Sequence, residues 1–192
     1  MHKIKQLVEI DNPVPRGAAL VAPGTGIVVG KQTGALLVRQ DLSFSAVTVA
    51  MVDGTTNGSI GNLPLCTLAA RNYQVLGAEV ELTAFSRVGT NITATATVKC
   101  AVGTALETTN DTFIATARNI LASQSAPAMV SGAGALAKTA GATGAATPLT
   151  VLAAAGTQQL FLNFGIADAG SAGNDSLLVT GTVRLLLVDM GA

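Results

Sequence analysis

The chain has 192 residues, of which 49% are hydrophobic, 11% are charged and only 3% are aromatic. Eleven basic and eleven acidic residues give a formal net charge of zero, which argues against a nucleic-acid partner because nothing favours phosphate contacts. No apolar run approaches the roughly 20 residues of a membrane helix, so we also expect no membrane partner. Because so few residues are charged, we expect much of the surface to be covered by other protein.

Residues 1–34 have the composition of an extended N-terminal arm. Pro13, Pro15 and Pro23 exclude a long helix or a central strand in this segment. The alternation within residues 4–10 predicts one short strand. The arm lacks the continuous apolar stretch of a secretory signal.

The arm is too apolar for a solvated tail and too rich in breakers to form its own domain. We therefore predict that it docks on another subunit or on an underlying shell, where it adds short strands to an exposed edge. The alternative is that it packs on its own sandwich as a first strand. The residues predicted to bind the partner are Ile4, Val8, Ile10, Val14, Leu20, Val21, Ile27 and Val28.

Residues 35–192 are predicted to form one antiparallel β-sandwich domain. Strand patterns begin at 35–40 and 44–52, and turn signals separate nearly all the later ones at short spacing, which is typical of a sandwich. The later strands are expected at 63–68, 74–85, 91–101, 113–117, 149–153, 158–167 and 176–189.

Two segments interrupt this pattern. Residues 112–122 could hold a helical turn, because Phe113, Ala117 and Ile120 fall near helical spacing, but we predict a strand followed by a short turn. Residues 125–156 are rich in Ala, Gly, Ser and Thr. Strand-like segments bound them on both sides, so we predict a long loop inside the domain instead of a linker.

The strands at 74–85 and 91–101 are predicted to form a hairpin. Their alternation favours a register in which Glu81 lies opposite Thr95, because every apolar residue then meets an apolar one. The inward pairs would be Val80 with Ala96, Leu82 with Ala94, and Ala78 with Val98. Glu79 and Glu81 would then share a solvated face near Lys99, which we favour over a catalytic carboxylate pair.

Few residues suggest chemistry. His2 is the only histidine, so a histidine-based triad or metal cluster is not available within the domain. The stretch PGTGIVVGK at 23–31 resembles a phosphate loop, but Thr25 and Gln32 stand where that motif needs Gly and Ser or Thr. We predict a glycine-rich turn there.

Two further features receive structural interpretations. The loop at 168–175 carries Asp168 and Asp175 and could bind Ca²⁺, but it lacks the alternating acidic spacing of a dedicated site. Cys66 and Cys100 are predicted to be buried thiols. We therefore predict no catalytic residue, no cofactor, no metal site and no enzyme activity.

Three runs resemble a pattern common in tailed-phage virion proteins: YQVLGAEVELTAF (73–85), TATVKCAVG (95–103) and TNDTFIATARNI (109–120). The closing stretch TGTVRLLLVDMG (180–191) is similar to the final strand of such proteins. The matching positions are Gly77, Val80, Leu82, Thr83, Ala84, Phe85, Val102, Gly103, Asp111, Phe113, Ala115, Thr116 and Ile120. The resemblance covers residues 62–192, except the long loop, and does not extend to the arm.

This resemblance implies a jelly-roll β-sandwich of the head-decoration (cement) or head-fibre type. It implies a homotrimer that binds the major capsid protein and stabilises the head, located on the capsid surface of the virion after synthesis in the host cytoplasm. A tail, neck or fibre component is the alternative within this class. A carbohydrate-binding β-sandwich is the alternative from another class, although sugar platforms usually use exposed aromatic residues, which are scarce here.

Overall fold

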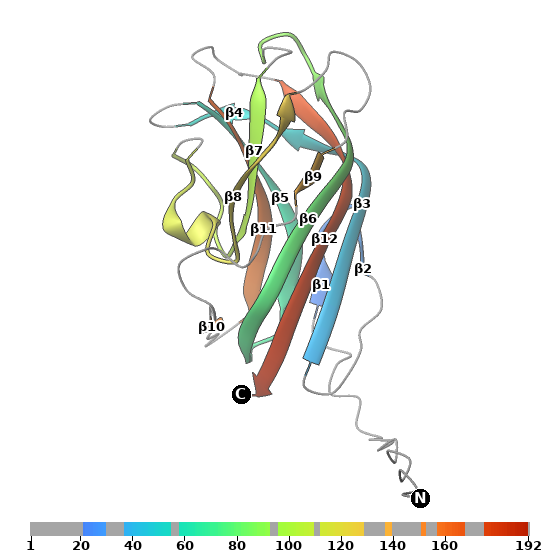
Figure 1. Ribbon diagram of the computed structural model, residues 1–192, viewed down its shortest axis with the longest axis vertical. Helices are drawn as coiled ribbons and strands as arrows, with labels where there is room; N and C mark the ends of the chain where they lie inside the picture. Colours follow the sequence, from blue (N-terminus) through green and yellow to red (C-terminus); the bar gives the residue numbers. More distant parts are fainter. Residues whose placement is uncertain are drawn as a thin grey trace, which may run out of the picture.

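In the computed structural model, the chain is an all-β sandwich of two antiparallel sheets, as the sequence predicts (Figure 1). The fold is almost free of helix in the part of the chain that the structure describes. That part comprises residues 21–29, 37–54, 58–92, 96–109, 112–128, 137–139, 151–152, 157–167 and 175–191.

Sheet 1 is the sheet in which β5 (Ser59–Leu68) and β11 (Gln158–Ile166) are central strands. Its strand order is β1-β5-β11-β7-β8, and β4 also pairs with β5. The remaining bounds are β1 (Val21–Pro23), β4 (Val52–Asp53), β7 (Thr97–Gly103) and β8 (Leu121–Ala128).

Sheet 2 is built on three long strands, β3 (Leu37–Ala50), β6 (Asn72–Val88) and β12 (Ser176–Gly191). Its strand order is β10-β6-β12-β3-β2, and β9 also pairs with β6. The short members are β2 (Ile27–Val29), β9 (Ala137–Thr139) and β10 (Val151–Leu152). Every pairing in both sheets is antiparallel.

The core lies between the two sheets and follows from the alternation of apolar residues along each strand. Sheet 2 contributes inward side chains from β12 that alternate with half-buried ones, and sheet 1 contributes the inward side of β11. Members of the core from these two strands are Leu160, Leu162, Phe164, Ile166, Leu177, Val179, Val183, Leu185 and Leu187.

The predicted hairpin between residues 74–85 and 91–101 is wrong. β6 pairs with β12, β9 and β10, whereas β7 pairs with β11 and β8, so the two segments belong to different sheets. Glu81 lies opposite Thr182, not Thr95. The chain between the strands crosses from one sheet to the other, so their apolar sides meet across the core instead of side by side.

The predicted orientation of the side chains in this region is nevertheless correct. Val80, Leu82 and Val98 are buried, and Ala78 and Ala96 also pack in or against the core. Ala94, also predicted to face inward, lies outside the described residues. Glu79 and Glu81 remain on the solvent side. Alternation thus identifies the buried face of a strand without identifying its neighbour.

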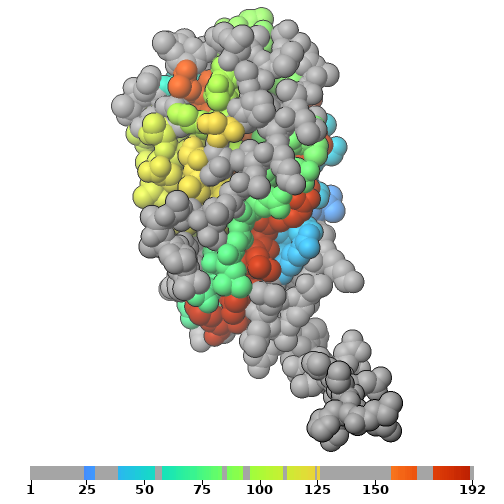
Figure 2. Space-filling view, in the orientation of Figure 1, coloured from blue at the N-terminus to red at the C-terminus, as the bar shows by residue number. Residues whose placement is uncertain are grey.

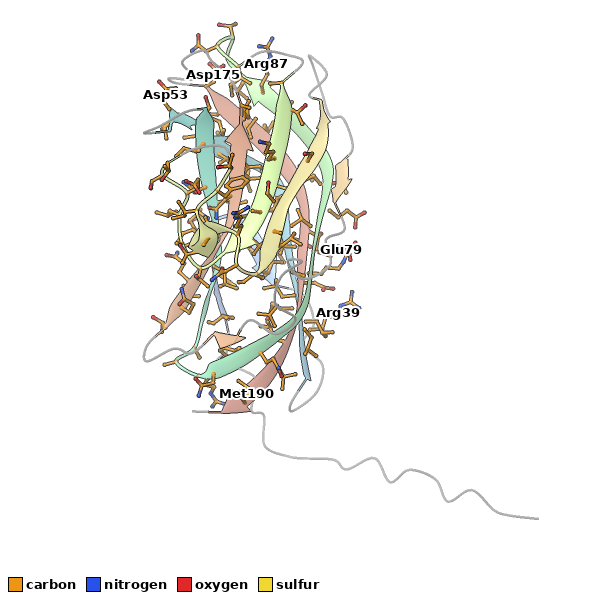
Figure 3. All side chains as sticks on the ribbon, turned by 60° about the vertical axis from the view of Figure 1, so that its left-hand side comes forward. Arg39, Asp53, Glu79, Arg87, Asp175 and Met190 are labelled. Atoms are coloured by element: carbon orange, nitrogen blue, oxygen red, sulfur yellow. The ribbon has the colours of Figure 1, made fainter. Side chains whose placement is uncertain are left out.

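A buried carboxylate stabilises this crossing between the sheets. The Oδ2 atom of Asp175 accepts a 2.6 Å hydrogen bond from the backbone N–H of Ile92, and the Arg87 guanidinium donates to the Ile92 carbonyl. Gly89 has a φ of 114°, and a Cβ there would lie 2.0 Å from an oxygen of Asp175. Figure 3 shows Arg87 and Asp175 at one end of the sandwich, and Met190 at the other.

Several predicted strand limits also change. The strands expected at 35–40 and 44–52 form one continuous strand, β3, which passes an irregularity where Ala46 has a φ of 51°. The strand expected at 113–117 is wrong, because Ala115–Ala117 forms a 3-10 helix, η1. Within the predicted long loop at 125–156, β8 continues to Ala128, and β9 and β10 pair with β6.

Part of the predicted arm lies in the sandwich itself. β1 pairs with β5 and β2 pairs with β3, so residues 21–29 add a short strand to each sheet. Residues 1–20 and 30–36 lie outside the described residues. Docking of the segment before Val21 on another subunit stays a prediction.

Both cysteines are buried, as predicted. Burial raises the pKa of the Cys66 thiol from 9.0 to about 12, because the charged thiolate is disfavoured in the core. Between pH 9.0 and about pH 12, the Cys66 thiol is therefore ionised in the unfolded chain but not in the folded one.

The thiol of Cys66 should therefore make stability fall with pH in alkaline solution. Relative to a Cys66→Ala variant, the free energy of unfolding should fall by up to about 1.4 kcal/mol per pH unit between about pH 9 and about pH 12. Below pH 9 the difference between the two proteins should be constant. Urea titrations across this range would measure it, and a constant difference up to pH 12 would contradict the burial.

Candidate functional site

The outer face of sheet 1 is covered by a loop between β7 and β8, the covering loop, described at residues 104–109 and 112–120 (Figure 1). It approaches the sheet so closely that a Cβ on Gly103 would lie 2.3 Å from the backbone of Ala117. Beneath it, Ala101, Phe113 and Ala117 form a small second core. β11 is consequently buried on both faces over residues 160–166.

Amide side chains of sheet 1 hold the covering loop in place. Asn163, fully buried on β11, donates to the carbonyls of Ala105 at 3.0 Å and of Ala117 at 2.7 Å. Asn62 on β5 bonds both the N–H and the carbonyl of Glu107, at 2.9 and 3.0 Å. These bonds satisfy backbone groups that burial would otherwise leave without water.

The carboxylate of Glu107 organises the loop from within. It is fully buried and accepts hydrogen bonds from the backbone N–H groups of Thr108 at 3.1 Å, of Thr109 at 2.7 Å and of Ile114. A carboxylate bonded in this way caps several backbone N–H groups of the loop at once. Sequence analysis missed Glu107, because no spacing in the TALETTND stretch distinguishes it.

The covering loop contains a strained residue. Phe113 has a φ of 61°, a left-handed conformation that is rare for a bulky side chain and costs of order 1–3 kcal/mol. Burial of its ring and the bond from Ile114 to Glu107 hold it there. The loop thereby presents Leu106 and Ile114 to solvent, 44% and 37% exposed.

The outer face of sheet 2 carries a row of ion pairs across its three long strands. The Arg184 guanidinium on β12 lies 2.8 Å from Glu81 and 3.3 Å from Glu79, both on β6. On β3, Arg39 pairs with Asp41 at 3.0 Å. The hydrogen bond to Glu81 raises the pKa of Arg184 above its ordinary value. The partner of the two glutamates is thus Arg184 and not the predicted Lys99, and the face is a solvated one.

The ion pairs of Arg184 should contribute little to stability. All three side chains are about one-third exposed, so water and salt screen the attraction. Arg184→Gln should lower the free energy of unfolding by less than about 1 kcal/mol. Thermal denaturation at low and high salt would check this, and a loss of several kcal/mol would show that the row is structural.

Another ion pair lies near the end of β12 on the inner side. Arg71 and Asp189 are 3.0 Å apart, and the Asp189 side chain is almost fully buried. Next to them, Tyr73 is buried in the core. Burial raises the pKa of the Tyr73 hydroxyl, and the charge of Asp189 adds to this while Arg71 opposes it.

A cleft of about 520 Å³ opens between β3 of sheet 2 and β5 of sheet 1. Residues 47–50 of β3 line one side, residues 62–64 of β5 line the other, and the turn at Gly24 and Thr25 lies at its end beside Gln159. The lining is apolar or uncharged throughout. This cleft is a candidate binding site because its volume falls in the range of ordinary ligand pockets.

The predicted partner-binding residues are not brought together in the described part of the chain. Ile27 packs in the core and Val28 is 68% exposed on β2. Val21 lies in β1. Ile4, Val8, Ile10, Val14 and Leu20 lie outside the described residues.

The two other candidates from the sequence are the glycine-rich turn and the aspartates Asp168 and Asp175. Residues 24–26 form the turn between β1 and β2, and the N–H of Ile27 bonds the carbonyl of Gly24 at 3.1 Å. Asp168 lies outside the described residues, and Asp175 is bonded to Ile92. Within the described part of the chain, no three Asp, Glu, Cys or His side chains are placed to share a metal ion.

The five aromatic rings that the structure describes lie inside the protein. Phe44, Tyr73, Phe113, Phe161 and Phe164 are all buried, and the side chain of Phe85 lies outside the description. A sugar-binding platform needs rings at the surface, so these five rings do not provide one.

A scan of the chain against models of protein families finds no match, and a search of curated proteins finds none either. Among the described residues, no helix has the length and apolar character needed to cross a membrane.

Proposed function

We propose that this chain is a non-enzymatic structural protein of a tailed-phage virion, a capsid decoration (cement) protein that binds the major capsid protein and stabilises the head. It assembles with copies of itself, as a homotrimer. The proposal rests on the fold together with the sequence resemblance over residues 62–192. A tail, neck or fibre component remains the alternative within the same class.

The strand order is the observation that carries this proposal. We count β3, β5, β6, β7, β8, the short pair β9 and β10, β11 and β12 as eight successive strands. The two sheets then have the orders 1-8-3-6 and 2-7-4-5. This interleaving supports a jelly roll, the eight-stranded double-sheet architecture that recurs in viral capsid proteins and in lectins.

The surroundings of the polar residues favour assembly over the lectin alternative. The buried Glu107, Asn163 and Asp175 bond to backbone groups of their own chain. The five described aromatic rings are buried. On the described surface, the charges of Arg184, Glu79 and Glu81 neutralise one another, and Leu106 and Ile114 are exposed on the covering loop, which suits contact with another protein surface.

Co-sedimentation tests the proposal. The purified protein should pellet with shells assembled from the major capsid protein of its virus, saturate at a fixed ratio to the shell subunits, and raise the melting temperature of the shells. Failure to bind shells, together with binding on a glycan array, would replace this function with the carbohydrate-binding one. Binding to purified tails instead of shells would favour the tail component.

A further inference from the structure

We infer that the exposed rim of the covering loop is the surface that binds the capsid shell, and that the shell presents to it an apolar recess beside a carboxylate. This inference rests on the proposed capsid-binding function and identifies the residues that carry it. We call this rim the loop patch. Its members, all exposed, are Leu106, Ile114, Ala115, Thr116 and Arg118.

The loop patch is compact because backbone hydrogen bonds bring its two stretches together. The carbonyl of Thr116 accepts bonds from the N–H groups of residues 104 and 105, at 2.9 and 3.2 Å. The N–H of Ala117 bonds the carbonyl of Ile114 at 3.1 Å, which closes the tight turn of η1. Figure 1 shows η1, in yellow, projecting from the flank of the sandwich, and Figure 2 shows yellow atoms of this region at the surface.

Arg118 gives the loop patch a charge that needs a partner. Among the charged side chains that the structure describes, Arg118 alone takes part in no ion pair and no hydrogen bond. A guanidinium binds a carboxylate with two parallel hydrogen bonds, and arginine is enriched among the residues that dominate protein interfaces. The geometry therefore favours a partner that offers an acidic group at this position.

A second copy of the chain does not match this requirement in its described part. Every carboxylate that the structure describes already has a partner, either an arginine, a backbone N–H group or another group of its own chain. These carboxylates are Asp41, Asp53, Glu79, Glu81, Glu107, Asp175 and Asp189. A different protein fits the loop patch better, and the proposed function supplies the shell.

Two aliphatic side chains supply the apolar part of the contact. Leu106 is 44% exposed and Ile114 is 37% exposed, so each has apolar area left to bury. Between them lies the buried Phe113, whose φ of 61° is strained. Strain of this kind is concentrated at binding sites, where the surrounding structure holds it. The strained residue directly precedes Ile114 and supports a binding role for this rim.

The covering loop is also ordered before any partner arrives. Asn163 and Asn62 hold it from below, and Glu107 bonds its N–H groups from within. At its base, the side chain of Asn119 exchanges two hydrogen bonds with Thr104, at 3.0 and 2.9 Å. A loop that is fixed in this way loses little conformational freedom on binding, so more of the contact energy appears as affinity.

Charge reversal at the loop patch tests the inference. In co-sedimentation with shells assembled from the major capsid protein of its virus, full-length Arg118→Glu should bind at least about tenfold more weakly than wild type, because two negative charges would meet across the contact. The matched control is Arg39→Glu on the outer face of sheet 2. It makes the same change in net charge at another exposed arginine and should leave binding unchanged.

A second pair of variants tests the apolar part without changing charge. Ile114→Ser should weaken binding to the same shells severalfold, because it removes an aliphatic side chain from the contact. The matched control is Leu76→Ser on β6, since Leu76 is 39% exposed and Ile114 is 37% exposed. Circular dichroism and thermal denaturation of all four variants establish that each is folded.

The outcomes separate this inference from the proposed function. Weaker binding by the two loop variants, with both controls at wild-type affinity, supports the loop patch as the shell-binding surface. Wild-type affinity in either loop variant, or equal weakening of variants and controls, overturns the inference and leaves capsid binding standing. Dissociation of the homotrimer by Arg118→Glu in mass photometry also overturns it, because the patch would then join copies of this chain. Failure of the wild-type protein to bind shells rejects both.

Discussion

Gly181→Ala is expected to lower the free energy of unfolding by about 3 kcal/mol or more, the upper range for overpacking. Gly181 lies in β12, between β6 and β3, beside a register shift. An added Cβ would lie 2.2 Å from the carbonyl oxygen of Glu81 and 3.1 Å from the Cα of Leu82. Because both contacts are backbone atoms of a paired strand, the clash can be relieved only by displacing β6.

Gly77→Ala is the matched control, in the same sheet. Gly77 lies on β6, and a Cβ there would meet no atom within 4 Å, so this change should alter stability by less than about 1 kcal/mol. Urea denaturation of both variants measures the difference. Equal effects of the two substitutions would mean that β6 and β12 do not approach as described.

Asn163→Leu is expected to cost about 2–4 kcal/mol and to loosen the covering loop. Leucine keeps a similar volume but removes the donor to the carbonyls of Ala105 and Ala117. Each buried acceptor left without a partner costs about 1–3 kcal/mol. Since the sandwich core lies on the other side of β11, the circular dichroism of the sheets should persist.

Limited proteolysis measures the loosening directly. Trypsin should cleave Asn163→Leu after Arg118, which is exposed on the covering loop, much faster than it cleaves wild type. Gln158→Leu is the matched control: its side chain donates to the Thr104 carbonyl at 3.2 Å and is only partly buried, so it should have a small effect. Unchanged cleavage of Asn163→Leu would show that other contacts hold the loop.

The sequence predicts the sheets better than their connections. Alternation correctly turns Val80 and Leu82 inward and Glu81 outward, because burial of a strand face is a local property. The neighbour of β6 depends on where the chain goes after Val88. That path is held by Asp175, 83 residues from its hydrogen-bond partner Ile92, and no local pattern encodes it.

The sequence did not predict the covering loop, for the same reason. Its shape depends on Asn62 and Asn163, which lie 45 to 58 residues from their partners in the loop. Glu107 then holds Phe113 and its neighbours in a conformation that propensity disfavours. The apparent strand at 113–117 therefore becomes a turn and a 3-10 helix. Tertiary hydrogen bonds override local preference there.

Cryo-electron microscopy of the virus particle that carries this chain tests the central claim most directly. We predict three-fold assemblies of a two-sheet sandwich on the outer surface of the capsid shell. The strands β6, β12 and β3, which lie side by side in green, red and blue in Figure 2, should be traceable in that order in each copy. A head without this sandwich, with the chain located in the tail or missing from the particle, would contradict the account.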